Sequence, residues 1–412
     1  MTGLVVIGAS YAGIQGALAA RDAGYSETIT VVADETWLPY QRPPLSKDFL
    51  AGAATEESLV LRDRAFFANK GIDLVVGVRA VDIDRRARKV GLAGHPELNF
   101  DKLLIGTGSR ARRLALPGAD LSGVLYLRTL QDAIDLRASL LDAAEIVIVG
   151  GGFIGLEVAA SACKLGKKVT VLESAPRLLE RAVSPTVSEF LLDVHLQHGV
   201  DIHLGETIVS IEGENGLVAA VQCGNGTKIR ADLVLVGVGG LPNDQIARDT
   251  GLSCTNGITV DDHGRTSDPN IFAAGDCATH YNSFAQDWIR LESVQNAQDQ
   301  AKAAGLAIAG STGPYASVPR FWSDQYDAKL QIVGISRNFD DQALRGSIDD
   351  GQFSIFYYRQ GKLIAVDSIN RPGEQLAARR LIAGGISPTP DQVTDLSFDL
   401  KSLPKPANAA RV

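Results

Sequence analysis

Cysteine is scarce in this chain: 412 residues contain four, at positions 163, 223, 254 and 277. No two of them form a CxxC pair, which argues against a disulfide framework and against a structural zinc site. We therefore expect a reducing compartment, the cytoplasm. His195, His198 and His203 lie close in sequence, but neither an HExxH motif nor a cysteine accompanies them. We expect surface or helix-cap roles for these histidines, and no metal site.

Long apolar runs and an excess of positive charge are also missing. No uncharged stretch reaches the roughly 18 residues that a transmembrane helix needs. The apolar segment 4–20 contains glycines and is preceded by no Lys or Arg, so we expect no signal peptide. Forty Lys and Arg against 48 Asp and Glu leave a net charge of -8. This balance gives no general attraction to nucleic acid or to an anionic membrane, and we expect neither as a partner.

Glycine, by contrast, is abundant at 42 residues, and one group of glycines follows a short β-rich run at 4–7. The turn reads GASYAG (8–13), and the pattern predicts a helix over 14–23 and a strand over 28–32. Asp34 follows this strand, where a carboxylate can meet a ribose hydroxyl. Ser10 stands where the motif usually has its second glycine. The segment predicts a Rossmann-like βαβ unit.

The same pattern returns further along the chain as GGGFIG (150–155). A predicted strand over 145–149 precedes it; a predicted helix over 156–165 and a strand over 169–172 follow, and Glu173 comes next. The spacing of about 140 residues indicates duplicated domains rather than a short repeat. Two dinucleotide sites suggest a flavin paired with a nicotinamide. Glu173 favours NADH because its carboxylate would repel a 2′-phosphate, although Arg177 leaves NADPH open.

Six further blocks carry a family resemblance. IGTGSR (105–110), GVGGLPN (237–243) and TSDPNIFAAGD (266–276) resemble the glutathione-reductase superfamily of two-dinucleotide flavoproteins. PYQRPPLSK (39–47), RLESVQNA (290–297) and FWSDQY (321–326) narrow the match. Over about residues 3–400 the chain resembles the oxygenase-coupled, NADH-dependent ferredoxin reductases.

The resemblance implies an α/β fold with two Rossmann-like dinucleotide-binding domains, glutathione-reductase-like, plus a small α+β C-terminal domain. We expect a discontinuous FAD-binding domain over 1–112 and 243–320. The NAD-binding domain would span 113–242, and the C-terminal domain 321–412. Alternating apolar residues in the last of these predict strands over 330–335, 353–358 and 363–369, followed by a helix near 375–383.

The implied activity is hydride transfer from NADH to FAD, then single-electron transfer to a [2Fe-2S] ferredoxin that supplies a cytochrome P-450 or Rieske oxygenase. Related disulfide reductases carry a redox cysteine pair near residue 40, and this chain has none there, so thiol exchange is not available. Two alternatives stay open: an NADH:rubredoxin or quinone reductase, and an NADH-sensing flavoprotein resembling apoptosis-inducing factor. We expect a monomer or weak dimer.

The resemblance also assigns site residues. Those implied at FAD are Gly8, Ala12, Gly13, Asp34, Arg42, Lys47, Ala80, Arg128, Asp276, Val294 and Trp322. Those implied at NADH are Gly150, Gly152, Ile154, Gly155, Glu157, Glu173 and Gly239. The ferredoxin would dock near Lys302, Trp322, Arg290 and Arg320.

Lys47 and Glu157 are the implied catalytic residues. Lys47 would stabilise negative charge on the reduced flavin, and Glu157 would reach the nicotinamide carboxamide and pair with Lys47. Each residue also has a plainer interpretation: a solvated lysine for Lys47, and for Glu157 a first-turn glutamate favoured by the helix dipole. Trp322 could likewise be a core side chain, and Asp276 a turn residue.

Overall fold

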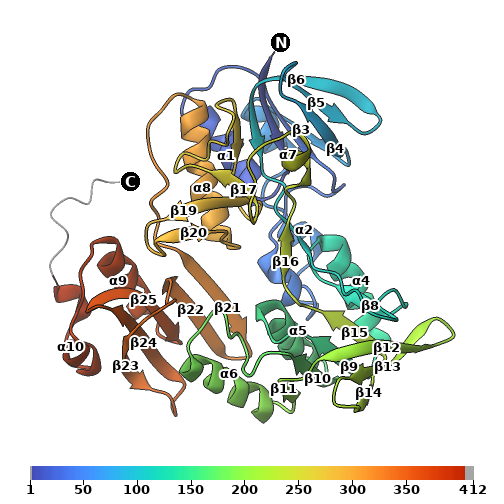
Figure 1. Ribbon diagram of the computed structural model, residues 1–412, viewed down its shortest axis with the longest axis vertical. Coiled ribbons are helices and arrows are strands. Elements are labelled where there is room, and N and C mark those ends of the chain that lie inside the picture. Colours follow the sequence, from blue (N-terminus) through green and yellow to red (C-terminus); the bar gives the residue numbers. More distant parts are fainter. Residues whose placement is uncertain (1, 404–412) are drawn as a thin grey trace. The chain divides into compact units, whose positions relative to one another are not determined.

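The computed structural model describes residues 2–403, and its contacts divide them into two compact units. Unit 1 comprises the segment up to Gln41, Val60–Arg110 and Leu241–Phe321; unit 2 comprises Arg42–Leu59, Ala111–Gly240 and the described residues from Trp322 onward. Figure 1 shows the elements of both. The segment from 322, predicted as a separate domain, therefore clusters with the region around the second glycine turn. The three domain limits themselves stay a prediction.

Unit 1 is built on a seven-stranded sheet of order β3-β2-β1-β6-β5-β4, to which β18 adds on β6. Strands β3, β2, β1, β6 and β18 run parallel, whereas β5 and β4 form an antiparallel extension. Strand β1 is buried throughout, as expected where helices cover a parallel sheet. The strands are β1 (Gly3–Ile7), β2 (Ile29–Ala33), β3 (Ile72–Val76), β4 (Ala80–Asp84), β5 (Lys89–Leu92), β6 (His95–Ile105) and β18 (Ile271–Ala273).

Two helices from distant parts of the sequence pack against each other in unit 1: α1 (Tyr11–Asp22) and α8 (Val294–Ile308). Their alanines share one apolar cluster with β1 and β2. This packing places the 290s beside the first glycine turn. The unit also contains α3 (Arg64–Asn69), α7 (Gln245–Asp249) and a small sheet of β17 (Ile258–Val260), β19 (Ala278–Asn282) and β20 (Asp287–Ile289).

Unit 2 contains a second, five-stranded parallel sheet of order β11-β10-β9-β15-β8. Its strands are β8 (Val124–Tyr126), β9 (Glu145–Val149), β10 (Lys168–Glu173), β11 (Asp201–Leu204) and β15 (Leu233–Val236). The helices here are α4 (Leu130–Asp142), α5 (Phe153–Lys164) and α6 (Pro185–Gln197). An antiparallel sheet of β12 (Ile208–Glu214), β13 (Leu217–Cys223) and β14 (Lys228–Arg230) accompanies them.

The C-terminal part of unit 2 contains a five-stranded sheet of order β21-β22-β25-β24-β23, in which the pairs from β22 to β23 are antiparallel and β21 begins at the end of unit 1. It is shown in orange and red in Figure 1. Its strands are β21 (Arg320–Gln325), β22 (Ala328–Gly334), β23 (Asp341–Ser347), β24 (Gln352–Arg359) and β25 (Lys362–Ile369). Helix α9 (Pro372–Ala383) contacts β25 and β22, and α10 (Pro390–Thr394) contacts β23. Leu156, Leu191 and Phe353 belong to one buried cluster, so this sheet shares a core with α5 and α6.

Shorter elements complete the described chain. They are η1 (Pro43–Ser46), α2 (Glu56–Leu59), η2 (Leu400–Ser402), and the paired strands β7 (Ser109–Ala111) and β16 (Gly240–Pro242). Within residues 2–403, every helix is too short or too polar to cross a bilayer.

The α/β fold class is confirmed, and the limits of the predicted helices and strands differ from the observed ones by up to three residues. Helices α1 and α5 start at Tyr11 and Phe153, three residues before the predicted starts. The apolar periodicity begins late because the last residues of each glycine turn already form the first helical turn. The predicted C-terminal strands and helix correspond to β22, β24, β25 and α9.

Candidate functional site

The first glycine turn joins β1 to α1 and is shaped by close backbone contacts. Gly8 has φ +105°, and a Cβ there would lie 2.2 Å from the Gly106 carbonyl oxygen. A Cβ on Gly13 would lie 1.8 Å from the Gly8 carbonyl oxygen. Any side chain at either position would displace backbone. Ser10 is the N-cap of α1. The turn thus brings backbone and a helix N-terminus together as phosphate-binding turns do.

The loop that carries Asp276 lies against the start of α1. A Cβ on Gly275 would lie 2.9 Å from the Cβ of Ala12, a buried residue of the first turn of that helix. The Asp276 carboxylate accepts a hydrogen bond from the Ser109 hydroxyl at 3.2 Å. The backbone carbonyl oxygen of Asp276 accepts one from the Arg290 guanidinium at 3.0 Å. Val294 begins α8. The structure therefore brings Ala12 and Asp276 together within unit 1.

The second turn, in unit 2, repeats the geometry of the first. Gly150 has φ +110°, and a Cβ there would lie 2.5 Å from the Gly237 carbonyl oxygen. A Cβ on Gly155 would lie 2.2 Å from the Gly150 carbonyl oxygen. Gly152, the N-cap of α5, is different, because the nearest atom beyond its chain neighbours, the Gly237 carbonyl oxygen, would be 4.0 Å from a Cβ. Both turns accordingly have the narrow backbone cradle that a dinucleotide pyrophosphate requires.

Glu173 ends β10 and is tied into the second turn. One carboxylate oxygen accepts a hydrogen bond from the Gly151 amide at 2.6 Å, and the other accepts one from the Ala175 amide at 2.7 Å. In unit 1 the predicted acid, Asp34, is exposed just after β2. The neighbouring Glu35 accepts a hydrogen bond from the Tyr40 hydroxyl at 2.5 Å. The Gly8 amide donates to the Val32 carbonyl oxygen and the Gly150 amide to that of Leu172, so Asp34 lies one residue further along the chain than the position that corresponds to Glu173. The two acids therefore have different local constraints.

Lys47 and Glu157 form the expected ion pair, with the ammonium nitrogen 2.7 Å from a carboxylate oxygen. Glu157 is 5% exposed, so this charge is buried and paired. One expectation is wrong: because α5 begins at Phe153, Glu157 is the fifth helical residue, past the first turn. The dipole of an exposed helix terminus therefore does not account for its position. The ion pair links α5 to the segment that follows η1.

Three more buried side chains complete the surroundings of Glu157. The Ser46 hydroxyl donates to the same oxygen as Lys47, at 2.5 Å, and the Ser323 hydroxyl donates to the other oxygen, at 2.6 Å. The Gln325 amide nitrogen donates to the Ser323 hydroxyl oxygen at 3.1 Å. These residues lie within the blocks 39–47 and 321–326 that carry the resemblance, but no role was assigned to them from the sequence. Strand alternation offered a signal, since Ser323 and Gln325 share one face of β21.

His195 lies at the far end of this network, and the expected surface or cap role is wrong for it. It is 0% exposed, and its Nε2 lies 2.9 Å from the Gln325 side-chain oxygen. Burial lowers the pKa of His195 to about 4, so the ring is neutral at pH 7. This placement was not predicted from the sequence. His195 lies on the buried face of α6, together with Val187, Ser188 and Leu191. By contrast, His198 is the C-cap of α6, as expected.

The remaining predicted residues are spread over both units. In unit 2, the Arg42 guanidinium donates to the Arg128 carbonyl oxygen at 2.7 Å, and the Gly239 carbonyl oxygen accepts from the Arg112 amide at 2.9 Å. Ile154 is 41% exposed on α5, and Trp322 is 37% exposed on β21. In unit 1, Ala80 begins β4, Lys302 is exposed on α8, Arg320 is half-buried, and the Arg290 side chain is 8% exposed.

The four cysteines are all free. Burial raises the pKa of each thiol above its usual value. The reactive form of cysteine is the thiolate, which these environments disfavour. The described structure therefore offers no activated thiol to accept electrons.

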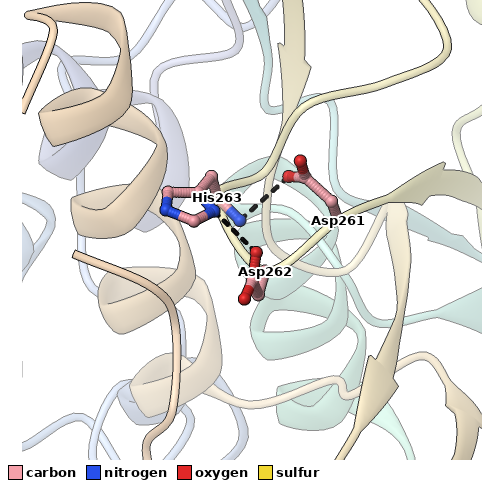
Figure 2. A group of neighbouring side chains, drawn as sticks. All are labelled: Asp261, Asp262 and His263. Carbon is pink, nitrogen blue, oxygen red and sulfur yellow. Dashed lines mark hydrogen bonds and ion pairs between the residues drawn. The ribbon is translucent and has the colours of Figure 1, made fainter. Parts of the chain in front are cut away.

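Asp261, Asp262 and His263 place two carboxylates and an imidazole within 4.8 Å of one another, in the turn after β17 (Figure 2). The Asp261 carboxylate accepts hydrogen bonds from the His263 and Arg265 amides. The Asp262 carboxylate lies 2.6 Å from the His263 ring nitrogen. Both aspartates are exposed, and these contacts account for the shape of the turn.

Two family patterns cover nearly the whole chain. The pyridine nucleotide-disulphide oxidoreductase family matches residues 2–301, and the family described as reductase C-terminal matches residues 320–404. The first therefore includes both glycine turns and the second includes β21.

Individual proteins match over similar lengths. Rhodocoxin reductase of Rhodococcus erythropolis is 44% identical over 398 residues, 97% of this chain and 93% of that protein. A rubredoxin-NAD(+) reductase of Pseudomonas putida is 38% identical over 372 residues, 90% of this chain and 97% of that protein. The crystal structure of a covalent putidaredoxin reductase-putidaredoxin complex superposes with a TM-score of 0.94 at 39% identity, covering 97% of each chain.

Proposed function

Because this chain belongs to the pyridine nucleotide-disulphide oxidoreductase family, we propose that it is an FAD-dependent NADH:ferredoxin reductase. The observation that carries the proposal is the pair of glycine turns, one in each unit, each with two glycines at which a side chain would collide with backbone. Two cradles fit two dinucleotides. Bound FAD would supply the conversion between a two-electron hydride donor and a one-electron acceptor.

Residues of unit 1 would hold the FAD phosphates and sugars. Backbone at Gly8, Ala12 and Gly13 would bind the pyrophosphate, and Asp34 the ribose. Asp276 would bind the ribityl chain, with Val294 and Ala80 as further contacts. The contact between Gly275 and Ala12 supports this grouping because it brings Asp276 to the same turn. The assignments of Arg42, Lys47, Arg128 and Trp322 to the flavin rest on the family resemblance.

Residues of unit 2 would hold NADH. Backbone at Gly150, Gly152, Ile154 and Gly155 would bind the pyrophosphate, near Gly239. Glu173 would accept from the adenosine ribose hydroxyls, since a carboxylate that accepts one amide at each oxygen retains further acceptor sites. Glu157 would bind the nicotinamide carboxamide. A buried carboxylate next to Lys47 stays fixed in place, which favours alignment over proton transfer.

Two observations support a small electron-carrier protein as the acceptor: the state of the thiols and the names of the relatives. Four cysteines with raised pKa values support direct delivery to an external carrier over a thiol relay. Rhodocoxin reductase and the putidaredoxin complex favour a [2Fe-2S] ferredoxin, docking near Lys302, Trp322, Arg290 and Arg320, whereas the rubredoxin-NAD(+) reductase keeps rubredoxin as the second candidate. Free cysteines favour a cytoplasmic location.

A steady-state assay tests the proposal. The FAD-loaded protein, NADH and cytochrome c would be combined with each [2Fe-2S] ferredoxin and each rubredoxin of the source organism. We expect ferredoxin to give the higher kcat/KM. A higher value with rubredoxin would transfer the proposal to that carrier. Slow flavin reduction on rapid mixing with NADH, with neither carrier turned over, would instead favour an NADH sensor.

A further inference from the structure

The surroundings of Glu157 contain more than its ion pair with Lys47. Its two oxygens accept from Lys47, Ser46 and Ser323, which come from two different segments of unit 2. Ser46 is further anchored to α5, because its carbonyl oxygen accepts from the Ser161 hydroxyl at 2.9 Å. Ser161 lies one helical turn after Glu157 on α5. One oxygen of Glu157 is therefore held by η1 and its end, and the other by β21.

The charge on Glu157 determines the direction of every hydrogen bond on the β21 side. An ionised carboxylate only accepts, so Ser323 must donate its single proton to Glu157. The Ser323 oxygen can then only accept, and the Gln325 amide nitrogen donates to it. That orientation turns the Gln325 oxygen toward His195. His195 must therefore carry its proton on Nε2.

Burial keeps this chain of groups in one orientation. Ser323 and His195 are 0% exposed, and Gln325 is 1% exposed, so water does not compete for these bonds. Burial also lowers the pKa of His195 to about 4, so the ring stays a neutral donor to Gln325 at neutral pH. The chain carries no charge beyond Glu157 itself.

We propose that Ser323, oriented by Gln325 and His195, is a positioning residue that sets the Glu157 carboxylate for the nicotinamide carboxamide of NADH. The inference rests on the proposed function, because it assumes that Glu157 contacts NADH. Ser323 acts through Glu157 alone. Loss of its hydroxyl frees one carboxylate oxygen, and the affinity for NADH falls without a change in the acceptor reaction.

The test is a double-mutant cycle on the FAD-loaded protein, with NADH as donor and ferricyanide as acceptor. Ser323→Ala should raise KM for NADH about tenfold and leave kcat within about twofold, the pattern of lost ground-state binding. Gln325→Leu should raise KM about threefold with kcat unchanged. In a Glu157→Gln background, each change should add less than about twofold, because the group through which it acts is altered.

Ser354→Ala is the matched control, because Ser354 is also 0% exposed in unit 2 but bonds the Ser368 hydroxyl, away from Glu157. It should leave KM for NADH unchanged. The proposal is overturned if Ser323→Ala keeps its full effect beside Glu157→Gln, if it has none in the unsubstituted background, or if Ser354→Ala matches it. Failure of the proposed function would show differently, as an unsubstituted protein that reduces ferricyanide but no ferredoxin.

Discussion

The two glycine turns of this protein share a backbone geometry and differ in what surrounds them. The first, in unit 1, has Ser10 at its middle position and an exposed acid, Asp34, after the next strand. The second, in unit 2, has Gly152 there, and Glu173 accepts a hydrogen bond from the turn itself. A shared motif therefore specifies the cradle, whereas neighbouring side chains determine how firmly its acid is held.

The units also differ in the ionisable groups that they bury. Unit 1 buries His280, whose pKa burial lowers to about 4. Unit 2 buries His195 with the same shift and also Asp367, whose pKa burial raises to about 7. The second unit thus combines two groups with opposite effects on stability as the pH changes.

The largest expected effect on activity comes from adding a side chain to one glycine turn at a time. Gly155→Ala would place a Cβ 2.2 Å from the Gly150 carbonyl oxygen, and Gly13→Ala one 1.8 Å from that of Gly8. We expect Gly155→Ala to slow flavin reduction by NADH more than about 100-fold, or about 2.8 kcal/mol, while FAD stays bound. Gly13→Ala should instead lose FAD. The flavin spectrum and rapid mixing with NADH measure the two effects.

Gly152→Ser is the matched control, since a Cβ at 152 would lie 4.0 Å from the Gly237 oxygen and Ser10 occupies the same N-cap position in the first turn. It should keep the melting temperature within about 4 °C of the unsubstituted protein. If Gly152→Ser slowed flavin reduction by NADH as much as Gly155→Ala does, the distinction between these two glycines would be wrong.

The largest expected effect on stability is the pH dependence contributed by Asp367. Its folded pKa of about 7 exceeds the value of 3.8 for a free aspartate, so the folded state holds the proton that the unfolded state releases. Stability is therefore lost as pH rises from about 4 to about 7, by at most about 4 kcal/mol. Asp367→Asn should raise the melting temperature more at pH 8 than at pH 5, measured by circular dichroism.

His280→Gln in unit 1 should change the pH dependence of stability in the opposite direction to Asp367→Asn. The folded pKa of His280, about 4, lies below its unfolded value of 6.5, so its burial destabilises the fold as pH falls between them. His280→Gln should therefore raise the melting temperature more at pH 5 than at pH 8. Equal shifts at both pH values for Asp367→Asn would show that Asp367 is not the titrating group.

The smallest of the expected effects concerns the two acids. Glu173→Ala should reduce the preference for NADH over NADPH by about tenfold, because both the repulsion of a 2′-phosphate and the bond to Gly151 are lost. Asp34→Ala, which removes the exposed acid, should weaken FAD retention by less than about tenfold, the change expected in the nucleotide preference of Glu173→Ala. Measured kcat/KM ratios for the two nucleotides test the first, and FAD release on dilution the second. An unchanged ratio would refute the role of Glu173.

Local patterns predicted the turns well because each turn is a local structure. Strand, glycines and helix are consecutive in sequence, and the glycine spacing follows from contacts such as that between Gly13 and Gly8. The helix starts were placed three residues late, since hydrophobic periodicity appears only after the first helical turn. The pairing of Lys47 with Glu157 was expected from the resemblance.

The polar network around Glu157 could not be predicted in the same way. Ser323 lies 166 positions from Glu157, and Gln325 lies 130 positions from His195. An isolated serine or glutamine on a strand has no preferred partner, and a histidine on an amphipathic helix reads as a surface residue. Only the alternation along β21 indicated that Ser323 and Gln325 face the same side.

The sequence by itself determined that this chain has two dinucleotide turns, an acid after each, and no cysteine pair beside the first. These features depend on residue types at short, set spacings, which backbone sterics enforce. The tertiary structure alone decided which distant side chains surround Glu157 and how firmly Glu173 is held. Such contacts depend on how helices and sheets pack, because burial makes a hydrogen bond directional and persistent only after the core has formed around it.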